Sequence, residues 1–537
     1  MNSTTASSHR RILTPCLNAD LGTSNTDNIE PLIITASGIE KQLKQLNPSK
    51  ASGPDELPAR ILKEVHKEIA SFLAKVYQQS YDTGEVPAEW RQANISAIYK
   101  KGDRSQAVNY RPVSLTSICC KIMEHVVYRH IIEHLELHQI LSDNQHGFRS
   151  NRSCETQLVN TIEAVARELD HRGQMDMLIL DFSKAFDTVP HQRLLNKMSH
   201  YGIRGNTLKW VSAWLTKRQQ RVCVDGENSK NNPVRSGVPQ GTVLGPLCFL
   251  VYINDMGNSI SRNTTLRLFA DDSLLYRSIK TTDDRRQLQE DLTTLTKWAD
   301  TWQMTFHPAK CYILRVTKKK SPIIENYEMM DHTLTTVHQY PYLGVELSEN
   351  LNWEPHINKA VSKANKTLGF LRRNIGKCPQ DIKEKAYLTL VRPHLEYSSA
   401  VWDPYRKHHI NKIEMVQRKA ARFVTSTYSR EPGTVTNILT DLDWPSLQSR
   451  RKINRLILFF KATHEKAAIN IPSYIRRPSI STRQYHSDKF SQIGTSTDAY
   501  KFSFLPRTIT DWNNLPPEAY QATSPESFKE IIQRLQL

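Results

Sequence analysis

The sequence predicts a mixed α+β fold, in which helices accompany antiparallel strands that carry acidic side chains at their ends. Residues 177–180 form a short apolar run that ends at Asp181, as is typical of a buried strand. Residues 266–270 alternate in polarity and an apolar segment follows Asp271 and Asp272, so the acidic pair is expected at the turn of a β-hairpin. Apolar residues at helical spacing elsewhere in the chain predict the helices.

The other elements follow along the chain. Residues 1–30 are rich in Ser, Thr and Asn without periodicity, which predicts a disordered leader over residues 1–34. Apolar spacing predicts helices over residues 39–46, 61–77, 193–200 and 357–375, and a short strand over residues 95–99. Pro190 suits the first turn of the helix over 193–200, because a first-turn residue needs no amide hydrogen.

The chain of 537 residues carries a large surplus of positive charge, 72 Lys and Arg against 54 Asp and Glu, or 72 − 54 = +18. Such a surplus favours polyanionic partners, because neutralising phosphates releases counterions. The alternative is a solvated basic surface that keeps the protein soluble. The best apolar run, residues 247–253, is far shorter than the roughly 18 residues that cross a bilayer, and residues 1–11 lack the apolar core of a secretory signal. An intracellular protein without a membrane partner is therefore expected.

A third of this surplus lies in residues 356–385, where eight Lys and Arg face two acidic residues, 8 − 2 = +6. The predicted helix there has an apolar stripe and a separate cationic face. The cationic face consists of Lys359, Lys363, Lys366 and Arg373. It could bind a phosphate backbone, and the alternative is an ordinary solvated helix surface.

Asp181 and the pair Asp271 and Asp272 are candidate metal ligands. Taken singly, an Asp at a strand end is usually a cap, and an Asp pair in a turn usually serves the turn. Carboxylates that two strands place side by side repel each other unless a cation neutralises them. Mg²⁺ prefers such oxygen ligands, and two ions about 3.5–4 Å apart can activate a hydroxyl and stabilise a leaving oxygen, as nucleotidyl transfer requires.

Seven segments resemble, in order, the motifs of reverse transcriptases from non-LTR retrotransposons, the LINE-like elements near the jockey type. Residues 181–187, 236–241 and 269–272 resemble palm motifs A, B and C. The other four segments resemble an upstream motif (49–58), two finger motifs (109–115 and 145–149) and the primer grip (342–345). The resemblance covers about residues 35–537.

This resemblance implies a right-hand polymerase fold, with an antiparallel palm sheet backed by helices and a helical C-terminal extension. The implied parts are the leader (1–34), an N-terminal segment and fingers (35–165), a palm with inserted finger elements (166–350, with the reverse transcriptase core at about 100–350), a basic helical thumb (351–430) and the extension (431–537).

The resemblance also implies roles at a metal site. Asp181 and Asp271 would be the principal ligands of two Mg²⁺ ions, Asp272 would support the same site, and the carbonyl of Phe182 would complete one coordination shell. Mn²⁺ could replace Mg²⁺. Lys310 matches the lysine that protonates the pyrophosphate leaving group, and general acid catalysis of this kind is typically worth about 10²–10⁴-fold. An ordinary surface lysine is the alternative.

Other matched positions would bind the incoming nucleotide. Phe186 matches a steric gate, whose ring excludes a ribose 2′-hydroxyl, although a core aromatic is the alternative. Gln240 and Gly241 match the loop that contacts the nucleotide and the template. Arg111 and Arg149 match finger positions that hold the triphosphate, to which a forked guanidinium is suited, and surface ion pairing is their alternative.

The implied function is RNA-directed DNA polymerisation, with an RNA template, a DNA primer held by the grip at Tyr342, Leu343 and Gly344, and dNTPs as partners. A catalytically silent, retroelement-derived nucleic-acid-binding protein is the alternative, and an intron-encoded maturase is a second one. About 35 residues precede the first matched segment, so the endonuclease that many relatives carry there is expected to be absent. Relatives act in the nucleus, which is the expected location.

Overall fold

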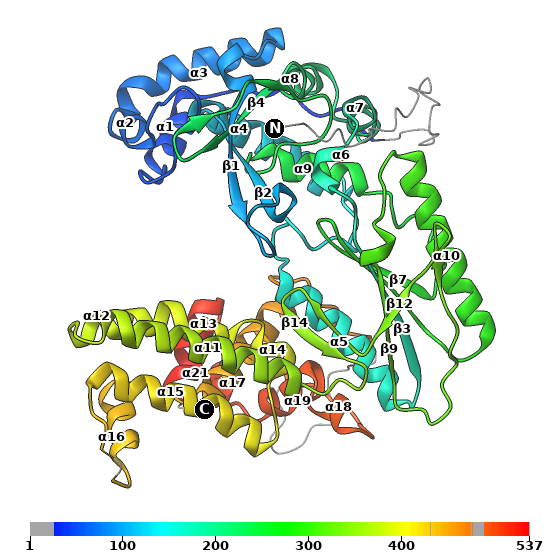
Figure 1. Cartoon of the computed structure of the whole chain (residues 1–537), viewed down its shortest axis with the longest axis vertical. Coiled ribbons are helices and arrows are strands. Elements are labelled where there is room, and N and C mark those ends of the chain that lie inside the picture. The colour runs from blue at the N-terminus through cyan, green and yellow to red at the C-terminus, as the bar shows by residue number, and fades with distance from the viewer. Residues whose placement is uncertain (1–25, 430, 474, 476–487, 536–537) are drawn as a thin grey trace. The chain divides into compact units, whose positions relative to one another are not determined.

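The computed structural model describes residues 26–429, 431–473, 475 and 488–535 (Figure 1). Most of the predicted leader, residues 1–25, lies outside the described residues. The chain divides into two compact units. Unit 1 comprises the described part of Met1–Ser142 with Phe182–Met256 and Leu295–Phe306, and unit 2 comprises Asp143–Asp181, Gly257–Thr294 and the described part of His307–Leu537.

A five-stranded sheet lies at the centre of unit 2. Its strands occur in the order β12 (Thr335–Val337), β9 (Tyr312–Thr317), β3 (Gln174–Leu180), β8 (Asp272–Ser278) and β7 (Thr264–Phe269). β3 is buried along its whole length, which explains its uninterrupted apolar run from Met177 to Leu180. All pairings in this sheet are antiparallel except that of β12 with β9. The predicted strand and hairpin are therefore confirmed.

Helix α5 (Cys154–Asp170) packs against β3, β7 and β9. It begins with a capping box, in which the Ser153 hydroxyl accepts from the Thr156 amide at 3.2 Å and the Thr156 hydroxyl accepts from the Ser153 amide at 2.9 Å. The C-terminal extension binds the same helix, since Asp170 Oδ1 accepts from the amides of Ser496 (2.8 Å) and Thr497 (2.6 Å). Sheet, α5 and extension thus belong to one compact unit.

The other elements of unit 2 are mainly helical. They are α10 (Thr282–Thr301, of which 282–294 belong to this unit), α11 (Glu354–Ile375), α12 (Gln380–Ala386), α13 (Pro393–Glu396), α14 (Ser399–Trp402), α15 (Lys407–Thr425), α16 (Thr434–Asp441), α17 (Leu447–Thr463), α18 (Asp498–Lys501), α19 (Phe504–Asn513), α20 (Pro517–Tyr520) and α21 (Pro525–Arg534). Two small antiparallel pairs join β10 (Glu328–Met329) to β11 (His332–Thr333), and β13 (Gln339–Tyr342) to β14 (Val345–Ser348). α11 buries Ile357, Val361, Ala364, Leu368 and Leu371, which confirms the predicted apolar stripe.

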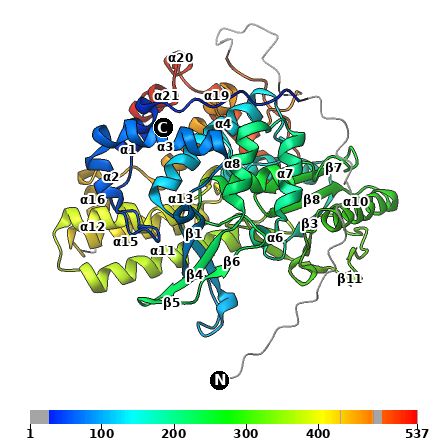
Figure 2. The same ribbon diagram turned by 90° about the horizontal axis from the view of Figure 1, so that it is seen from above.

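Unit 1 contains a second sheet, seen from above in Figure 2. β1 (Gln92–Tyr99) pairs antiparallel with β2 (Tyr110–Leu115) and parallel with β4 (Gln219–Val224), which also pairs with the short strands β5 (Glu227–Asn228) and β6 (Asn232–Pro233). The strand predicted over 95–99 is thus confirmed and begins earlier, at Gln92.

The helices of unit 1 are α1 (Ala36–Lys44), α2 (Ala59–Glu64), α3 (His66–Thr83), α4 (Ile118–Leu137), α6 (Ala185–Thr188), α7 (His191–His200), α8 (Gly205–Leu215) and α9 (Leu244–Ile253). The single helix predicted over 61–77 is wrong in one respect: it is interrupted at Val65, where the backbone leaves helical geometry (φ −94°, ψ 25°). α9 buries all but one of its side chains, which accounts for the apolar run 247–253 without any membrane role. Among the described residues, no helix is both long and apolar enough to span a membrane.

Candidate active site

The strand pairing of unit 2 gathers three carboxylates at one end of the sheet. Leu180 of β3 lies opposite Ser273 of β8, so the next pair along the antiparallel ladder is Asp181 and Asp272. In the β7–β8 hairpin, Phe269 lies opposite Asp272, which leaves Ala270 and Asp271 as the two turn residues. The structure therefore brings together the three acidic residues that the sequence predicted as metal ligands.

The electrostatics confirm this proximity. Asp272, the first residue of β8, is exposed to solvent. Even so, partial desolvation and then the negative charges of Asp271 and Asp181 raise the pKa of its carboxyl to about 6. The site thus holds negative charge that its own residues do not fully compensate.

Lys310 lies beside these carboxylates. Its Nζ is 3.8 Å from Oδ2 of Asp181, and both side chains are partly exposed. A 3-10 turn over Pro308–Lys310 places it there, because the His307 amide donates to the Asp181 carbonyl at 2.8 Å and the Lys310 amide donates back to the His307 carbonyl at 2.8 Å. Lys310 is therefore within reach of a group bound at Asp181.

Gln145 clamps the acidic turn, a role that its sequence context did not predict. Its Oε1 accepts from the amides of Ala270 (2.9 Å) and Gly147 (2.7 Å), and its Nε2 lies 3.4 Å from the Ala270 carbonyl oxygen. Ala270 has φ +53°, a left-handed conformation that is uncommon for residues other than glycine, so the turn needs external support.

Residues 144–146 form a short extension of the sheet beside β7. The Leu268 amide donates to the Asn144 carbonyl at 2.9 Å, and the His146 amide donates to the Leu268 carbonyl at 2.8 Å. Gly147 follows, where a Cβ atom would lie 2.5 Å from the Ala270 nitrogen, so that only glycine fits. The finger motif over 145–149 thus packs directly against the motif over 269–272.

Arg149 lies in the same part of unit 2, close to a buried histidine. Burial lowers the pKa of His146 to about 3, and the positive charges of Arg152, Arg267 and Arg149 contribute. His146 Nδ1 is 2.9 Å from the Thr156 hydroxyl, which holds the ring against the first turn of α5. Arg149 is therefore one of three arginines around this ring.

Tyr340 is a second residue near the carboxylates that sequence reasoning missed. Burial and then the negative charges of Asp272 and Asp181 raise the pKa of its phenol to about 12. Its ring centroid is 5.5 Å from that of Tyr312 in β9. Its position just before the predicted primer grip was the only available signal, and that signal did not relate it to Asp181.

The predicted primer grip forms the turn between β13 and β14. Tyr342 is buried, and its hydroxyl accepts from Gln157 Nε2 at 3.1 Å, so its side chain belongs to the core. Leu343 (φ +44°) and Gly344 (φ +84°) make a two-residue turn, and the Tyr397 hydroxyl donates to the Leu343 carbonyl at 2.9 Å. A grip role would therefore rest on the backbone of this turn.

Five predicted site residues belong to unit 1. Arg111 lies in β2 and is exposed, and the ring of Phe182 stacks on Phe306 with centroids 4.3 Å apart. Phe186 is half-buried and stacks on Phe249 at 4.4 Å. The remaining two are Gln240 and Gly241. The Gln240 carbonyl accepts from the Ser114 amide at 2.7 Å, and Gly241 has φ +92°.

Motifs A and B come together within unit 1. The Val238 amide donates to the Phe186 carbonyl at 2.7 Å, and the Gly237 amide donates to the Val189 carbonyl at 2.8 Å. A Cβ atom on Gly237 would lie 2.7 Å from the backbone of Asp187. Beside this contact is a cavity of about 420 Å³, and Gln240 is among its lining residues.

The cationic face of α11 is exposed, as predicted. Lys363, Lys366 and Arg373 project from it, whereas Lys359 forms an ion pair with Glu346. Three of the four predicted basic side chains are therefore not paired with an acid among the described residues.

The resemblance to reverse transcriptases implies acidic residues at the ends of antiparallel strands with a lysine beside them, and the structure has this arrangement. Residues 98–347 match the family model described as reverse transcriptase (RNA-dependent DNA polymerase). This confirms the resemblance on which the site residues were chosen.

Curated relatives extend the similarity beyond the matched domain. The chain is 28% identical over 413 residues to "Probable RNA-directed DNA polymerase from transposon BS" of Drosophila melanogaster, covering 73% of this chain and 44% of that protein. It is 27% identical over 476 residues to "RNA-directed DNA polymerase from mobile element jockey" of Drosophila funebris, covering 85% and 50%. The chain thus spans about half the length of these relatives.

The chemistry of the donor set fits a divalent metal ion. Reverse transcriptases generally use such ions, and Asp181, Asp271 and Asp272 offer hard oxygen donors whose mutual repulsion a cation would relieve. Within the described ranges, no group of three or more His, Cys, Asp and Glu side chains is arranged to hold an ion by itself. Mg²⁺ takes one or two carboxylates and completes its shell with water and substrate phosphates.

Removing the charge of Asp272 should stabilise the metal-free protein. Because its pKa is raised, its ionisation disfavours the folded state: the penalty is absent below about pH 4, where Asp is protonated in both states, and complete above about pH 6. In EDTA at pH 7.5, Asp272→Asn should therefore raise the free energy of unfolding by about 1–2 kcal/mol after allowance for solvent screening. Urea unfolding from pH 4 to 8 measures this difference.

The control is Asp331→Asn, an isosteric change at an exposed carboxylate in another turn of the same unit. It should change stability little at any pH. A stabilisation by Asp272→Asn that is equally large at pH 4 would contradict the electrostatic explanation.

Loss of the Gln145 side chain should loosen the acidic turn. Gln145→Met keeps most of the volume but leaves the buried amides of Ala270 and Gly147 without their acceptor, at a cost of about 1–3 kcal/mol in unfolding free energy. Primer extension should slow by about tenfold if about 1.4 kcal/mol of this energy serves to position the carboxylates. Single-turnover kinetics measure the slowing, and an unchanged rate in a destabilised variant would show that the clamp is structural only.

Proposed function

We propose that this chain is an RNA-directed DNA polymerase that adds dNTPs to the 3′-hydroxyl of a DNA primer on an RNA template. The observation that carries this proposal is the placement of Asp181 opposite Asp272, with Asp271 in the adjoining turn, inside a reverse transcriptase domain. The alternative of a catalytically silent binding protein is not favoured, because the acidic residues and the lysine beside them are present and assembled.

In this proposal the three carboxylates hold two Mg²⁺ ions, and Mn²⁺ could replace them. Bound there, the ions would supply Lewis acid activation of the primer hydroxyl and neutralise charge on the leaving pyrophosphate. Asp272 has to lose its proton to serve as a ligand. Metal binding at this site should therefore weaken as the pH falls below about 6, the pKa of the Asp272 carboxyl.

The other residues of the proposal act on the substrate. Lys310, whose Nζ is 3.8 Å from Oδ2 of Asp181, would donate a proton to the leaving pyrophosphate oxygen. Phe186, held by its stack on Phe249, would exclude a ribose 2′-hydroxyl, and Arg111 and Arg149 would bind the triphosphate. Gln240 and Gly241 would face the nucleotide and template.

Nucleic acid would be bound by two further features of unit 2. The turn at Leu343 and Gly344 would hold the primer through its backbone, and the exposed cations of α11 would bind the phosphates. The domain boundaries and the nuclear location stay predictions.

Primer extension on poly(rA)/oligo(dT) with Mg²⁺ tests the proposal. The wild-type chain should extend the primer, and Asp181→Asn or Asp271→Asn should reduce extension by at least about 10³-fold, because each removes charge at the site of metal binding. Binding of the same primer–template, measured by fluorescence anisotropy, should be retained in both variants. A wild-type chain that binds RNA and extends nothing would favour the silent alternative.

A further inference from the structure

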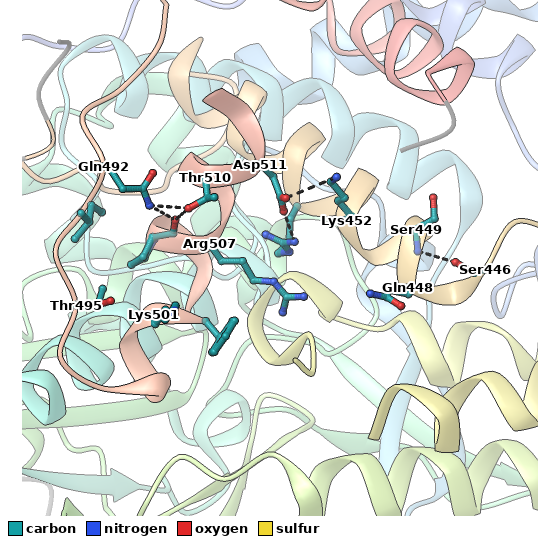
Figure 3. A pocket seen from close by; sticks show the side chains of 14 residues that line it. Ser446, Gln448, Ser449, Lys452, Gln492, Thr495, Lys501, Arg507, Thr510 and Asp511 are labelled. Carbon is teal, nitrogen blue, oxygen red and sulfur yellow. Dashed lines mark hydrogen bonds and ion pairs between the residues drawn. The ribbon is translucent and has the colours of Figure 1, made fainter. Parts of the chain in front are cut away.

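The C-terminal extension contains a cationic cavity that the proposed polymerase site does not use (Figure 3). The cavity has a volume of about 820 Å³ and lies among α17, α19 and residues 492–502, all of them in unit 2. The charged side chains among its described lining residues are Lys452, Arg455, Lys501, Arg507 and Asp511.

A buried ion cluster shares Arg455 and Arg507 with the lining of this cavity. Asp403, which is 5% exposed, is the shared partner of three arginines. Its Oδ1 is 2.8 Å from Nε of Arg451, and its Oδ2 is 3.1 Å from Nε of Arg455 and 3.3 Å from Nη2 of Arg507. One carboxylate therefore serves three guanidinium groups.

Asp511 is the second carboxylate of the cluster. Its Oδ2 is 2.8 Å from Nη2 of Arg455 and its Oδ1 is 3.7 Å from Nζ of Lys452, as Figure 3 shows for the lysine. Lys501 is exposed and forms no ion pair with another described residue. The charged lining residues Lys452, Arg455, Lys501 and Arg507 against Asp511 carry 4 − 1 = +3.

Two observations show that this surplus is poorly compensated. Arg451 is fully buried, yet its Nη1 and Nη2 have no hydrogen-bond partner among the described residues. Desolvation lowers the pKa of Arg507 and the charges of Arg455 and Arg451 lower it further, while Asp403 and Asp511 offset only part of this shift. Glu414, which accepts from the Gln448 amide at the start of α17, reduces the surplus only to +2. Partly buried cations of this kind are unfavourable without a counter-anion.

We propose that this cavity binds phosphate groups of a single-stranded nucleic acid. Guanidinium and ammonium groups are the side chains that bind phosphate oxygens best. The lining also includes Phe502, whose ring stacks on Tyr405 at 4.0 Å and offers a surface for a base. The phosphate chemistry follows from the lining alone, whereas nucleic acid as its source rests on the proposed function.

Hydrogen–deuterium exchange of the full chain without dNTPs tests this inference independently of polymerisation. The probes are 5′-phosphorylated tetrathymidylate, its 5′-hydroxyl counterpart and inorganic phosphate. Residues 446–455 and 504–513 should become protected on addition of the oligonucleotides. Protection by both oligonucleotides would identify the phosphodiester backbone, and protection by the phosphorylated one alone would identify the terminal phosphate.

Substitutions locate the effect. The double variant Lys452→Gln/Lys501→Gln should raise the oligonucleotide concentration needed for half-maximal protection by about tenfold. The slope of log affinity against log salt concentration should fall by about 1.4, since each single-strand phosphate contact contributes about 0.7. The control Lys529→Gln removes one positive charge from an exposed position of α21 outside the cavity, and it should not change the protection. Lys501→Gln alone, which breaks no ion pair, serves if the double variant is unstable.

The inference is overturned if neither oligonucleotide protects these residues, or if Lys529→Gln weakens protection as much as the cavity variants do. Protection by inorganic phosphate without either oligonucleotide would overturn the assignment to nucleic acid. A chain that lacks primer extension but shows oligonucleotide protection would refute the proposed function and leave the phosphate site intact.

Discussion

The register between β3 and β8 is the constraint on which the candidate site depends. A slip of one residue would turn every side chain of β3 to the opposite face and remove Asp181 from its position opposite Asp272. Packing prevents that slip, because Leu178 lies opposite Leu275 on one side and Ile313 on the other, and all three are fully buried. Apolar burial in the sheet thus holds like charges together at its end.

This arrangement stores unfavourable electrostatic energy at the site where we propose that a cation binds. Lys310 lies 3.8 Å from Asp181 and offsets part of this energy, and the pKa of Asp272 is raised by burial first and then by the charges of Asp271 and Asp181. The turn that carries Asp271 adds a left-handed Ala270, which Gln145 holds from the neighbouring segment. Repulsion and backbone strain at one place, supported by a buried sheet and a side-chain clamp, are typical of a functional site.

Local patterns predicted the parts of this site that depend on one segment. The apolar run before Asp181 and the alternation before Asp271 identified their strands, because burial and pleating impose these patterns directly. The clamp by Gln145 and the approach of Tyr340 depend on contacts between segments far apart in the sequence, which periodicity does not encode. The helical spacing of apolar residues also continues through Val65, where the backbone interrupts the predicted helix. No local pattern indicated that Tyr342 is a core residue.

Anomalous diffraction from crystals of the full chain with primer–template and Mn²⁺ tests the central claim most directly. The register predicts an anomalous peak within bonding distance of the carboxylates of Asp181 and Asp272, and its loss in Asp181→Asn. Manganese bound only elsewhere, with these two carboxylates apart or unliganded, would contradict the account.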